Sequence, residues 1–330
     1  MNPDSLTDPA SEPVWAVLGA SGFIGSALQS ALTARGITVR YVKAPRLTAV
    51  STDAAGILAE ATRLENERLD LAGALAGADV VINAAGLATP SGADSPALRG
   101  ANALLPVLVA DAADAAGVRR FVHLSSAAVQ GHRAFLDESS YVQPFSAYSR
   151  SKALGEDALA ARSQKDCSVV TIRATSVQGP GRQTTLTLVR VAATPLASVA
   201  GRGEAPTPVS SVHALTEFTA AVASYDGEVP PVVLQPWEGA TVADVLRAAG
   251  GREPKRLPRW FCKASLKAGY AVSALLRERF HGPLRRLEMM WFGQRQEPGW
   301  AEAAGKVPAP QVVQVLTQAR TARQRMDPAS

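Results

Sequence analysis

Cysteine and aromatic residues are scarce in this chain of 330 residues, in which aromatic side chains make up only 5%. Its two cysteines, Cys167 and Cys262, are too few for a disulfide framework, and the residues around them lack the spacing of a metal site. We therefore expect no bound metal, no disulfide-stapled fold and a reducing compartment, the cytoplasm. At this length the chain can instead bury a large core in an α/β unit with an appended lobe.

Long uninterrupted apolar runs are also missing. Residues 1–13 are polar and proline-rich without a basic region or an apolar core, so we expect a disordered tail and no signal peptide. The apolar stretch 260–276 is interrupted by Lys263 and Lys267, which makes it too short and too charged to span a bilayer. A basic amphipathic helix on a membrane surface has this pattern, and so does a helix packed under a substrate lobe, which we favour.

Acidic residues are few in one part of the sequence. The formal net charge is +5, and the excess lies between residues 252 and 286, where only Glu253 and Glu278 oppose many lysines and arginines. Such a segment favours an anionic partner. Because no nucleic-acid module is recognisable and aromatic residues are sparse, we expect a phosphorylated small molecule and no nucleic acid.

Apolar segments of strand character alternate with alanine-rich helical stretches in the first half of the chain. The strand-like segments are residues 14–18, 37–42, 78–85, 120–126 and 167–174. This alternation predicts an α/β fold with a doubly wound parallel sheet of the Rossmann type over residues 14–175. Residues 176–330, richer in glycine and proline, are expected to form mainly a smaller substrate-binding lobe, with residues 207–235 returning to the sheet.

A glycine-rich turn, "GASGFIG", joins the first predicted strand to the first predicted helix. Gly19, Gly22 and Gly25 let the backbone approach a pyrophosphate closely, and the helix N-terminus offers unpaired N–H groups. The turn therefore predicts a dinucleotide site. Such folds usually place an acidic residue after the second strand to bind ribose, but here Arg40, Lys43 and Arg46 occupy that region. A basic side chain pairs with a 2′-phosphate, so we expect NADP, with NAD as the alternative.

A tyrosine and a lysine share one face of a predicted helix. Tyr148 and Lys152 are four residues apart, and we expect the ammonium to lower the pKa of the phenol toward the range of a general acid or base. Ser125 and Ser126 end a predicted strand at the edge where parallel sheets bind ligands. His123 and His213 have no place in this arrangement.

The motifs "GASGFIG", "DLAGALAGADVVINAAG", "FVHLSSAAVQG", "YSRSK" and "TIRATSVQGPG" resemble, in order and spacing, those of the extended short-chain dehydrogenase/reductases, the NAD-dependent epimerase/dehydratase family. The resemblance implies a catalytic triad of Ser126, Tyr148 and Lys152. It also implies a pyrophosphate site and further cofactor contacts, which comprise Gly19, Ser21, Gly22, Phe23, Ile24, Gly25, Asp70, Leu71, Ala84, Ala85, Gly86, Asn102, Ala174 and Thr175.

These contacts have separate implied roles. Asp70 and Leu71 would meet the adenine, residues 84–86 the ribose, and Ala174 and Thr175 the nicotinamide end. Asn102 matches a structural asparagine beside the cofactor. The chain departs from the family pattern at Lys43, at Gln130 (often tyrosine) and at Ala174 (often proline), none of which belongs to the triad.

Ala127 and Ala128 stand where the family's dehydratases carry an acidic pair, so sugar dehydration is unexpected. We expect an NADPH-dependent ketoreductase acting on a nucleotide-linked keto sugar whose diphosphate meets the basic second lobe. The alternatives are an NAD-dependent nucleotide-sugar epimerase and a hydroxysteroid- or flavonoid-type dehydrogenase. A non-catalytic NADP-sensing regulator is the alternative from another functional class. Proteins that resemble this chain are commonly dimers, so a homodimer is possible by the same resemblance.

Overall fold

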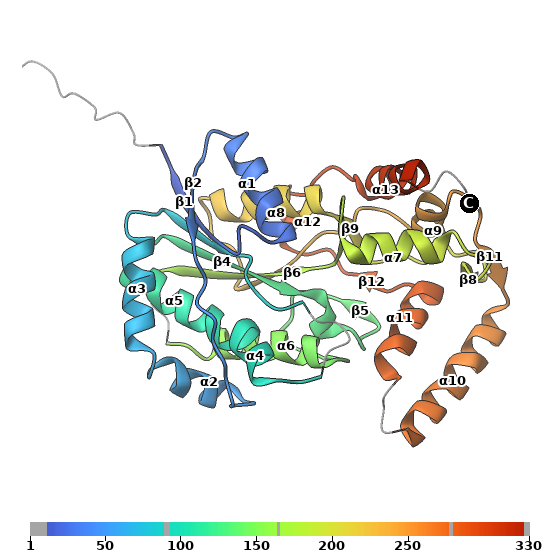
Figure 1. Ribbon diagram of the computed structural model, residues 1–330, viewed down its shortest axis with the longest axis horizontal. Helices are drawn as coiled ribbons and strands as arrows, with labels where there is room; N and C mark the ends of the chain where they lie inside the picture. The colour runs from blue at the N-terminus through green and yellow to red at the C-terminus, as the bar shows by residue number, and fades with distance from the viewer. Residues whose placement is uncertain (1–11, 89–92, 164–165, 277–279, 327–330) are drawn as a thin grey trace, which may run out of the picture.

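The computed structural model describes residues 12–88, 93–163, 166–276 and 280–326. Most of the predicted tail therefore lies outside the described residues. Two lobes lie side by side, a sheet-containing lobe and a smaller helical one (Figure 1). The site described below lies where the strands of the first lobe point toward the second.

The first lobe is built on a six-stranded parallel sheet in the order β10-β6-β4-β3-β1-β2. The strands are β1 (Val14–Leu18), β2 (Thr38–Val42), β3 (Val80–Asn83), β4 (Arg120–Ser126), β6 (Ser168–Ala174) and β10 (Val232–Leu234). Five of them are the strands expected from the sequence, so the doubly wound α/β fold is confirmed. The sixth, β10, comes from much later in the chain and pairs with β6.

Helices cover both faces of the sheet. One face carries α1 (Phe23–Thr33), α8 (Val212–Ser224) and α12 (Trp300–Ala303); the other carries α2 (Ala54–Ala61), α3 (Glu65–Leu75), α4 (Pro96–Arg99), the π-helical turn η1 (Gly100–Leu104), α5 (Leu105–Ala115) and α6 (Ala147–Ala160) (Figure 1). Alternate strand residues point to opposite faces. Trp15 and Val17 therefore join the core under α1 and α8, whereas Ala16 and Leu18 join the core under α5.

The second lobe follows β6 and contains short strands and longer helices. Its elements are β7 (Ser176–Gln178), α7 (Gln183–Ala192), β8 (Ser198–Ala200), β9 (Val209–Ser211), α9 (Val242–Gly250), β11 (Lys255–Leu257), α10 (Arg259–Leu275), α11 (His281–Phe292), β12 (Arg295–Gln296) and α13 (Val312–Met326). Val189, Leu246 and Leu316 centre the core between α7, α9 and α13. The turn η2 (Ala127–Gln130) and the strand β5 (Phe135–Leu136), which pairs with β12, connect the lobes.

The sheet ends earlier than usual beyond β2. Dinucleotide-binding sheets commonly have the order 3-2-1-4-5-6, with one more strand outside the second. Here the described residues between β2 and β3 form the helices α2 and α3 and no strand, so β2 is the edge of the sheet. Leu71 and Leu75, four residues apart on α3, are buried against α5, which explains why this segment packs as a helix.

The stretch 260–276 forms α10. Among the described residues no helix has both the length and the apolar content needed to cross a membrane, as expected. The favoured interpretation is a helix packed under the lobe, but only one side of α10 is packed against the lobe. Cys262, Leu266 and Ser273 are buried, but Trp260 and Leu275 are 72% and 85% exposed.

Candidate active site

The glycine turn after β1 brings two backbone segments into contact. Gly19 has a φ of +80°, and a Cβ atom there would lie 2.6 Å from the amide nitrogen of Ala85, so only glycine fits. A Cβ atom on Gly25 would lie 2.1 Å from the carbonyl oxygen of Gly19. The N-cap residue of α1, Gly22, makes no side-chain capping bond, which leaves the first-turn N–H groups for an anion. These residues fit the pyrophosphate of a dinucleotide.

Lys43 directly follows β2, and Arg40 lies in the middle of that strand. Val42 pairs with Leu18 in the sheet, so Lys43 lies beside Gly19, and it is exposed. The guanidinium of Arg40 instead donates hydrogen bonds to the carbonyl oxygens of Ala74 (3.3 Å) and Ala76 (2.6 Å) at the end of α3. Lys43 is therefore the better placed of the two to meet a ribose 2′-phosphate.

Asp70 and Leu71 are not brought to the glycine turn. Both lie in the middle of α3, where Asp70 is exposed and the Leu71 side chain is 4% exposed in the core. The adenine contact that the resemblance implies for them stays a prediction, and it would have to be made from α3.

The segment after β3 meets the helix that carries the predicted catalytic residues. A Cβ atom on Gly86 would lie 2.8 Å from Oδ1 of Asn102 and 3.3 Å from Nζ of Lys152. Asn102, fully buried in η1, accepts a bond from the Leu87 amide and donates to the Leu87 carbonyl and to the Ser151 hydroxyl, each at 3.0 Å. Asn102 thus fastens the loop after β3 to α6.

Ser126 and Tyr148 face each other across the end of the sheet. Ser126 ends β4 and accepts a hydrogen bond from the amide of Ala128 at 3.2 Å. Its hydroxyl is also one of the groups that act to lower the pKa of Tyr148. Tyr148 lies in the first turn of α6, whose N-terminus is fixed by a capping box between Ser146 and Ser149. The side chain of the preceding Ser125 points to the other face of the sheet.

The buried Lys152 is held against the floor of the site. Its Nζ donates a hydrogen bond of 2.9 Å to the carbonyl oxygen of Leu124. Desolvation lowers the pKa of Lys152 to about 8, although the carboxylate of Glu156 acts in the opposite direction. The ammonium is therefore still the main form at neutral pH.

The prediction that Lys152 lowers the pKa of Tyr148 is wrong. Burial raises the pKa of the phenol, and the two groups that act to lower it are the Ser126 hydroxyl and the charge of Arg182. The phenol consequently keeps its proton at neutral pH. Such a group suits the donation of a proton to a developing oxyanion.

Arg182, which sequence reasoning missed, is a cation beside Tyr148. It precedes α7, donates a hydrogen bond to the carbonyl oxygen of Val177, and places its guanidinium 4.8 Å from the centre of the Phe23 ring. Burial lowers the pKa of Arg182, and only an ionised Tyr148 would oppose that shift. Arg182 directly follows the motif "TIRATSVQGPG", within the sequence "GPGRQ". That sequence has no periodic pattern from which a role for the arginine could be predicted.

Thr175 lies after β6, with its amide and hydroxyl bonded to Oε1 of Gln235 at 3.0 and 3.2 Å. Ala174, the last residue of β6, is buried. His123 is buried in β4, where its Nδ1 lies 3.3 Å from Nδ2 of Asn83. Desolvation, helped by the charge of Lys152, holds the pKa of His123 well below its usual value, so it is a neutral core residue.

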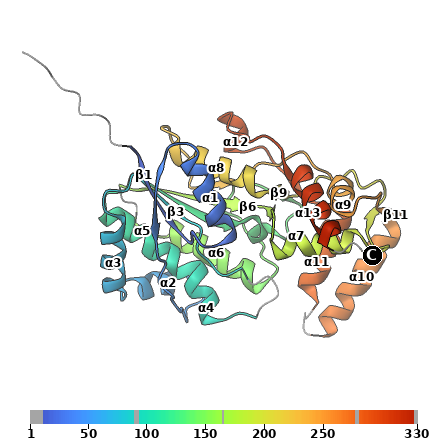
Figure 2. The same cartoon turned by 45° about the horizontal axis from the view of Figure 1, so that its top comes forward.

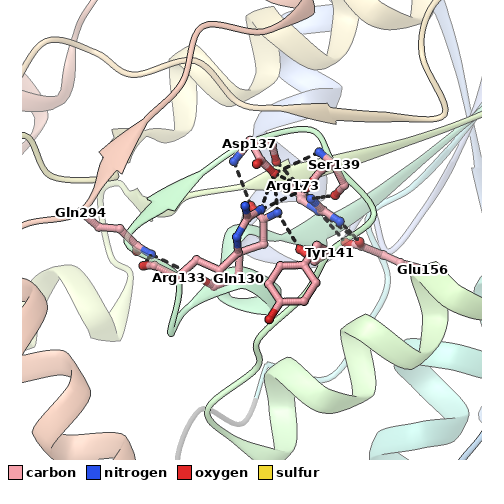
Figure 3. A network of polar contacts seen from close by, with 8 residues as sticks. All are labelled: Gln130, Arg133, Asp137, Ser139, Tyr141, Glu156, Arg173 and Gln294. Atoms are coloured by element: carbon pink, nitrogen blue, oxygen red, sulfur yellow. Dashed lines mark hydrogen bonds and ion pairs between the residues drawn. The ribbon is translucent and has the colours of Figure 1, made fainter.

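A buried ion pair joins the sheet to the helix that carries the predicted catalytic residues Tyr148 and Lys152. Arg173 on β6 donates to Glu156 on α6 at 2.7 Å, and the side chains of this pair are 1% and 5% exposed. Figure 3 shows Arg173 beside Glu156. Glu156 also accepts a 2.5 Å hydrogen bond from Ser125. Arg173 further donates to the backbone carbonyl oxygens of Asp137 (3.0 Å) and Ser139 (2.7 Å). The pair thereby joins β4, β6, α6 and the loop after β5.

The same network continues to the second lobe. The side chain of Asp137 accepts bonds from Gln130 (2.7 Å) and Arg133 (2.6 Å), and Gln294 of the second lobe donates to the Arg133 carbonyl at 2.9 Å (Figure 3). Burial acts to raise the pKa of Asp137, but hydrogen bonds from Ser139, Gln130 and Arg133 outweigh it and lower that pKa to about 2. Gln130, a departure from the family pattern, is therefore a structural member of this network.

A sequence model described as the NAD dependent epimerase/dehydratase family matches residues 15–221, more than half of the chain. A curated relative from Stigmatella aurantiaca, 4-hydroxy-2-methyl-3-oxo-4-farnesyl-3,4-dihydroquinoline-1-oxide ketoreductase, is 34% identical over 168 residues. That match covers 49% of this chain and 50% of the relative. The chain thus spans about half the length of the curated relative it matches.

Solved structures share the fold over nearly the whole chain. MoeE5 in complex with UDP-glucose and NAD matches with a TM-score of 0.62 and 21% identity, covering 94% of this chain and 99% of its own. UDP-glucuronic acid 4-epimerase from Bacillus cereus with NAD gives 0.63 and 17%, covering 95% and 99%. The human epimerase family protein SDR39U1 with NADPH gives 0.61 and 20%, covering 93% and 99%. NAD and NADPH are both represented among the cofactors of these structures.

We expect Arg173→Met to lower the free energy of unfolding by about 3–5 kcal/mol, because it leaves the carboxylate of Glu156 buried without its partner. Urea titration followed by circular dichroism measures the change. Arg247→Met removes ion pairs of a half-exposed arginine and is the matched control, expected to lose less than about 1 kcal/mol. Equal losses in the two variants would contradict the supporting role of the buried pair.

Proposed function

This chain belongs to the NAD-dependent epimerase/dehydratase family, and we propose that within this family of oxidoreductases and epimerases it is an NADPH-dependent ketoreductase. The observation that carries the proposal is the proton-bearing phenol of Tyr148, in the first turn of α6, together with Ser126 at the end of β4. The curated relative, a ketoreductase, supports the same reaction type.

In the proposed reduction of a ketone, Tyr148 and Ser126 have different roles. When bound, NADPH supplies the hydride that reduces the ketone carbon. Tyr148 gives its proton to the ketone oxygen, so that a ketone, a hydride and a proton yield an alcohol. Ser126 donates a hydrogen bond to the same oxygen and holds it against the phenol. A phenol whose pKa is raised by burial favours this direction, because it carries the proton that reduction consumes.

Binding of the cofactor is assigned to the glycine turn and its neighbours. Gly19, Gly22 and Gly25 would hold the pyrophosphate, and residues 84–86 would line the ribose. Lys43, exposed beside Gly19, would pair with the 2′-phosphate that distinguishes NADPH from NADH. The ammonium of Lys152, close to Gly86, would contact the nicotinamide ribose.

Arg182 supports a substrate that carries an anionic group. Its guanidinium lies near both Tyr148 and the ring of Phe23 at the start of α1, so it faces reacting groups and the cofactor turn together. The lysines of the basic segment are less suited to this task, since Lys263 and Lys267 are exposed on α10. We therefore propose a nucleotide-linked keto sugar whose diphosphate pairs with Arg182.

A second substrate class is an uncharged ketone on an apolar ring system. The observation that favours it is the 34% identity to a ketoreductase whose named substrate is a farnesylated dihydroquinoline oxide. The two substrate classes differ in charge, so a substitution of Arg182 should affect the binding of the anionic class and leave that of the uncharged class unchanged.

We expect Tyr148→Phe to lower turnover by about a hundredfold or more, because the ring still packs while the transferable proton is gone. Stopped-flow oxidation of NADPH against a panel of nucleotide-linked and apolar ketones measures it. The affinity for NADPH should stay within about threefold of the parent, with Ser126→Ala intermediate in turnover. A parent protein that binds NADPH but reduces no ketone of either class would favour the sensor alternative over the enzyme.

Lys43→Asp tests the choice of cofactor. We expect the parent to bind NADPH at least about tenfold more tightly than NADH, and the variant to remove or reverse that preference. Fluorescence titration with both cofactors measures it, and Lys255→Glu, an exposed lysine of the other lobe, should leave both affinities unchanged. Equal affinities for NADPH and NADH in the parent would refute the NADP preference.

Arg182→Met tests the substrate class. For a nucleotide-linked keto sugar we expect KM to rise at least about tenfold, because a partly buried cation that pairs with the diphosphate is lost. For an uncharged ketone KM should change by less than about twofold. Arg190→Met, an exposed arginine on α7, is the control. Turnover of apolar ketones alone, or an unchanged KM for the nucleotide-linked substrate, would exclude the anionic-substrate proposal.

A further inference from the structure

Helices α10 and α11 form a hairpin at the far end of the second lobe. In both views α11 lies between α10 and the sheet-containing lobe, so one side of α10 is turned away from the rest of the molecule (Figures 1 and 2). The buried side of α10 packs through Cys262 and Leu266 with Trp291 of α11. At Gly269 the helices approach so closely that a Cβ atom would lie 2.7 Å from Cδ2 of Leu284.

The opposite side of α10 is apolar and exposed. At 100° per residue one face of this helix is formed by a set of side chains that are all exposed and all apolar. These residues, hereafter the outer face, are Trp260, Phe261, Ala264, Ala268, Ala271, Val272 and Leu275. Exposure reaches 72% at Trp260, 54% at Val272 and 85% at Leu275. A continuous exposed face of this kind marks an interaction site in a folded protein.

Two further features extend the outer face. Leu276, which follows α10, and Phe280, which precedes α11, are 50% and 46% exposed at the end of the hairpin where the two helices are connected. Beside the face lies a hollow of about 460 Å³ whose lining is apolar and includes Val272, Phe280 and Leu284. Together these surfaces give the hairpin an apolar end and an apolar groove.

Basic side chains border the outer face along one edge. Arg259, Lys263 and Lys267 follow one another at four-residue intervals, which places them in one row on α10, and all three are exposed. The sequence of α10 contains no acidic residue. Lys255 and Arg256 of the adjacent β11 add exposed positive charge near the start of the helix.

We propose that the outer face of α10 binds the surface of an anionic lipid bilayer. Trp260 would lie at the headgroup level, the apolar residues would enter the acyl boundary, and Lys263 and Lys267 would contact anionic headgroups. A second copy of the chain is a poorer occupant. A symmetric contact through this face would bring the two rows of lysines toward each other without an acidic residue on either helix.

The binding is peripheral. α10 carries Lys263 and Lys267 within its length, and among the described helices none meets the requirements for a membrane span. The helix therefore lies in the plane of the interface with its buried side still packed on α11. The proposal is independent of the substrate, because it uses none of the residues assigned to the active site.

Flotation of the full chain with vesicles tests the proposal. Vesicles of phosphatidylcholine with phosphatidylglycerol should carry the parent protein, and vesicles of phosphatidylcholine alone should carry at least about tenfold less. Trp260→Ser with Leu275→Ser should lower binding at least about tenfold through lost apolar contact, and Lys263→Glu with Lys267→Glu should do so through charge. Leu196→Ser, which changes an 81% exposed leucine elsewhere in the lobe, is the matched control and should bind like the parent.

Tryptophan fluorescence gives a second readout from the same samples. Anionic vesicles should shift the emission of the parent to the blue, and Trp260→Phe should remove that shift while the protein still floats. Equal binding to both vesicle types, no binding, or binding unaffected by the two double variants would overturn the proposal. So would a parent dimer, measured by light scattering, that Leu275→Ser converts to a monomer, because the outer face would then be covered by a second copy.

Discussion

The ion pair between Arg173 and Glu156 is the interaction on which the other parts of the site depend. Arg173 belongs to a central strand, Glu156 to the helix that carries Tyr148 and Lys152, and the remaining donors of Arg173 reach the loop after β5. The Ser125 hydroxyl donates to the same carboxylate. This bond fixes the backbone at the end of β4 and therefore the orientation of the neighbouring Ser126. An isolated buried charge would be costly, and here each charge is paired and hydrogen-bonded. The orientation of the proposed catalytic side chains is thus set by contacts in the core.

Much of this architecture was predictable because it depends on local patterns. The parallel strands have buried apolar runs, and Gly19 and Gly25 occur where a Cβ atom would collide with backbone. The positions of Ser126 and Tyr148 followed from a strand end and a helix start. Each of these features is encoded within a few consecutive residues.

Other features depend on contacts between distant segments. Asp70 and Leu71 belong to α3, and the burial of Leu71 and Leu75 against α5 depends on a segment at least 30 residues further along the chain. Arg182 reaches Phe23 across about half the chain, and no sequence period relates them. The pKa of Tyr148 likewise depends on burial of the phenol and on the charge of Arg182. Neither effect can be predicted from the four-residue spacing between Tyr148 and Lys152.

The early end of the sheet has a consequence for how this molecule behaves among its own copies. An edge strand offers unpaired N–H and C=O groups to any extended chain that approaches, which is a common route to aggregation. β2 is a short strand with Arg40 in its middle and Lys43 just past its end. The guanidinium of Arg40 is anchored to the last carbonyls of α3, so a fixed positive charge lies at this edge. A charge fixed on an edge strand disfavours the addition of another strand, so Arg40 is expected to limit self-association at this edge.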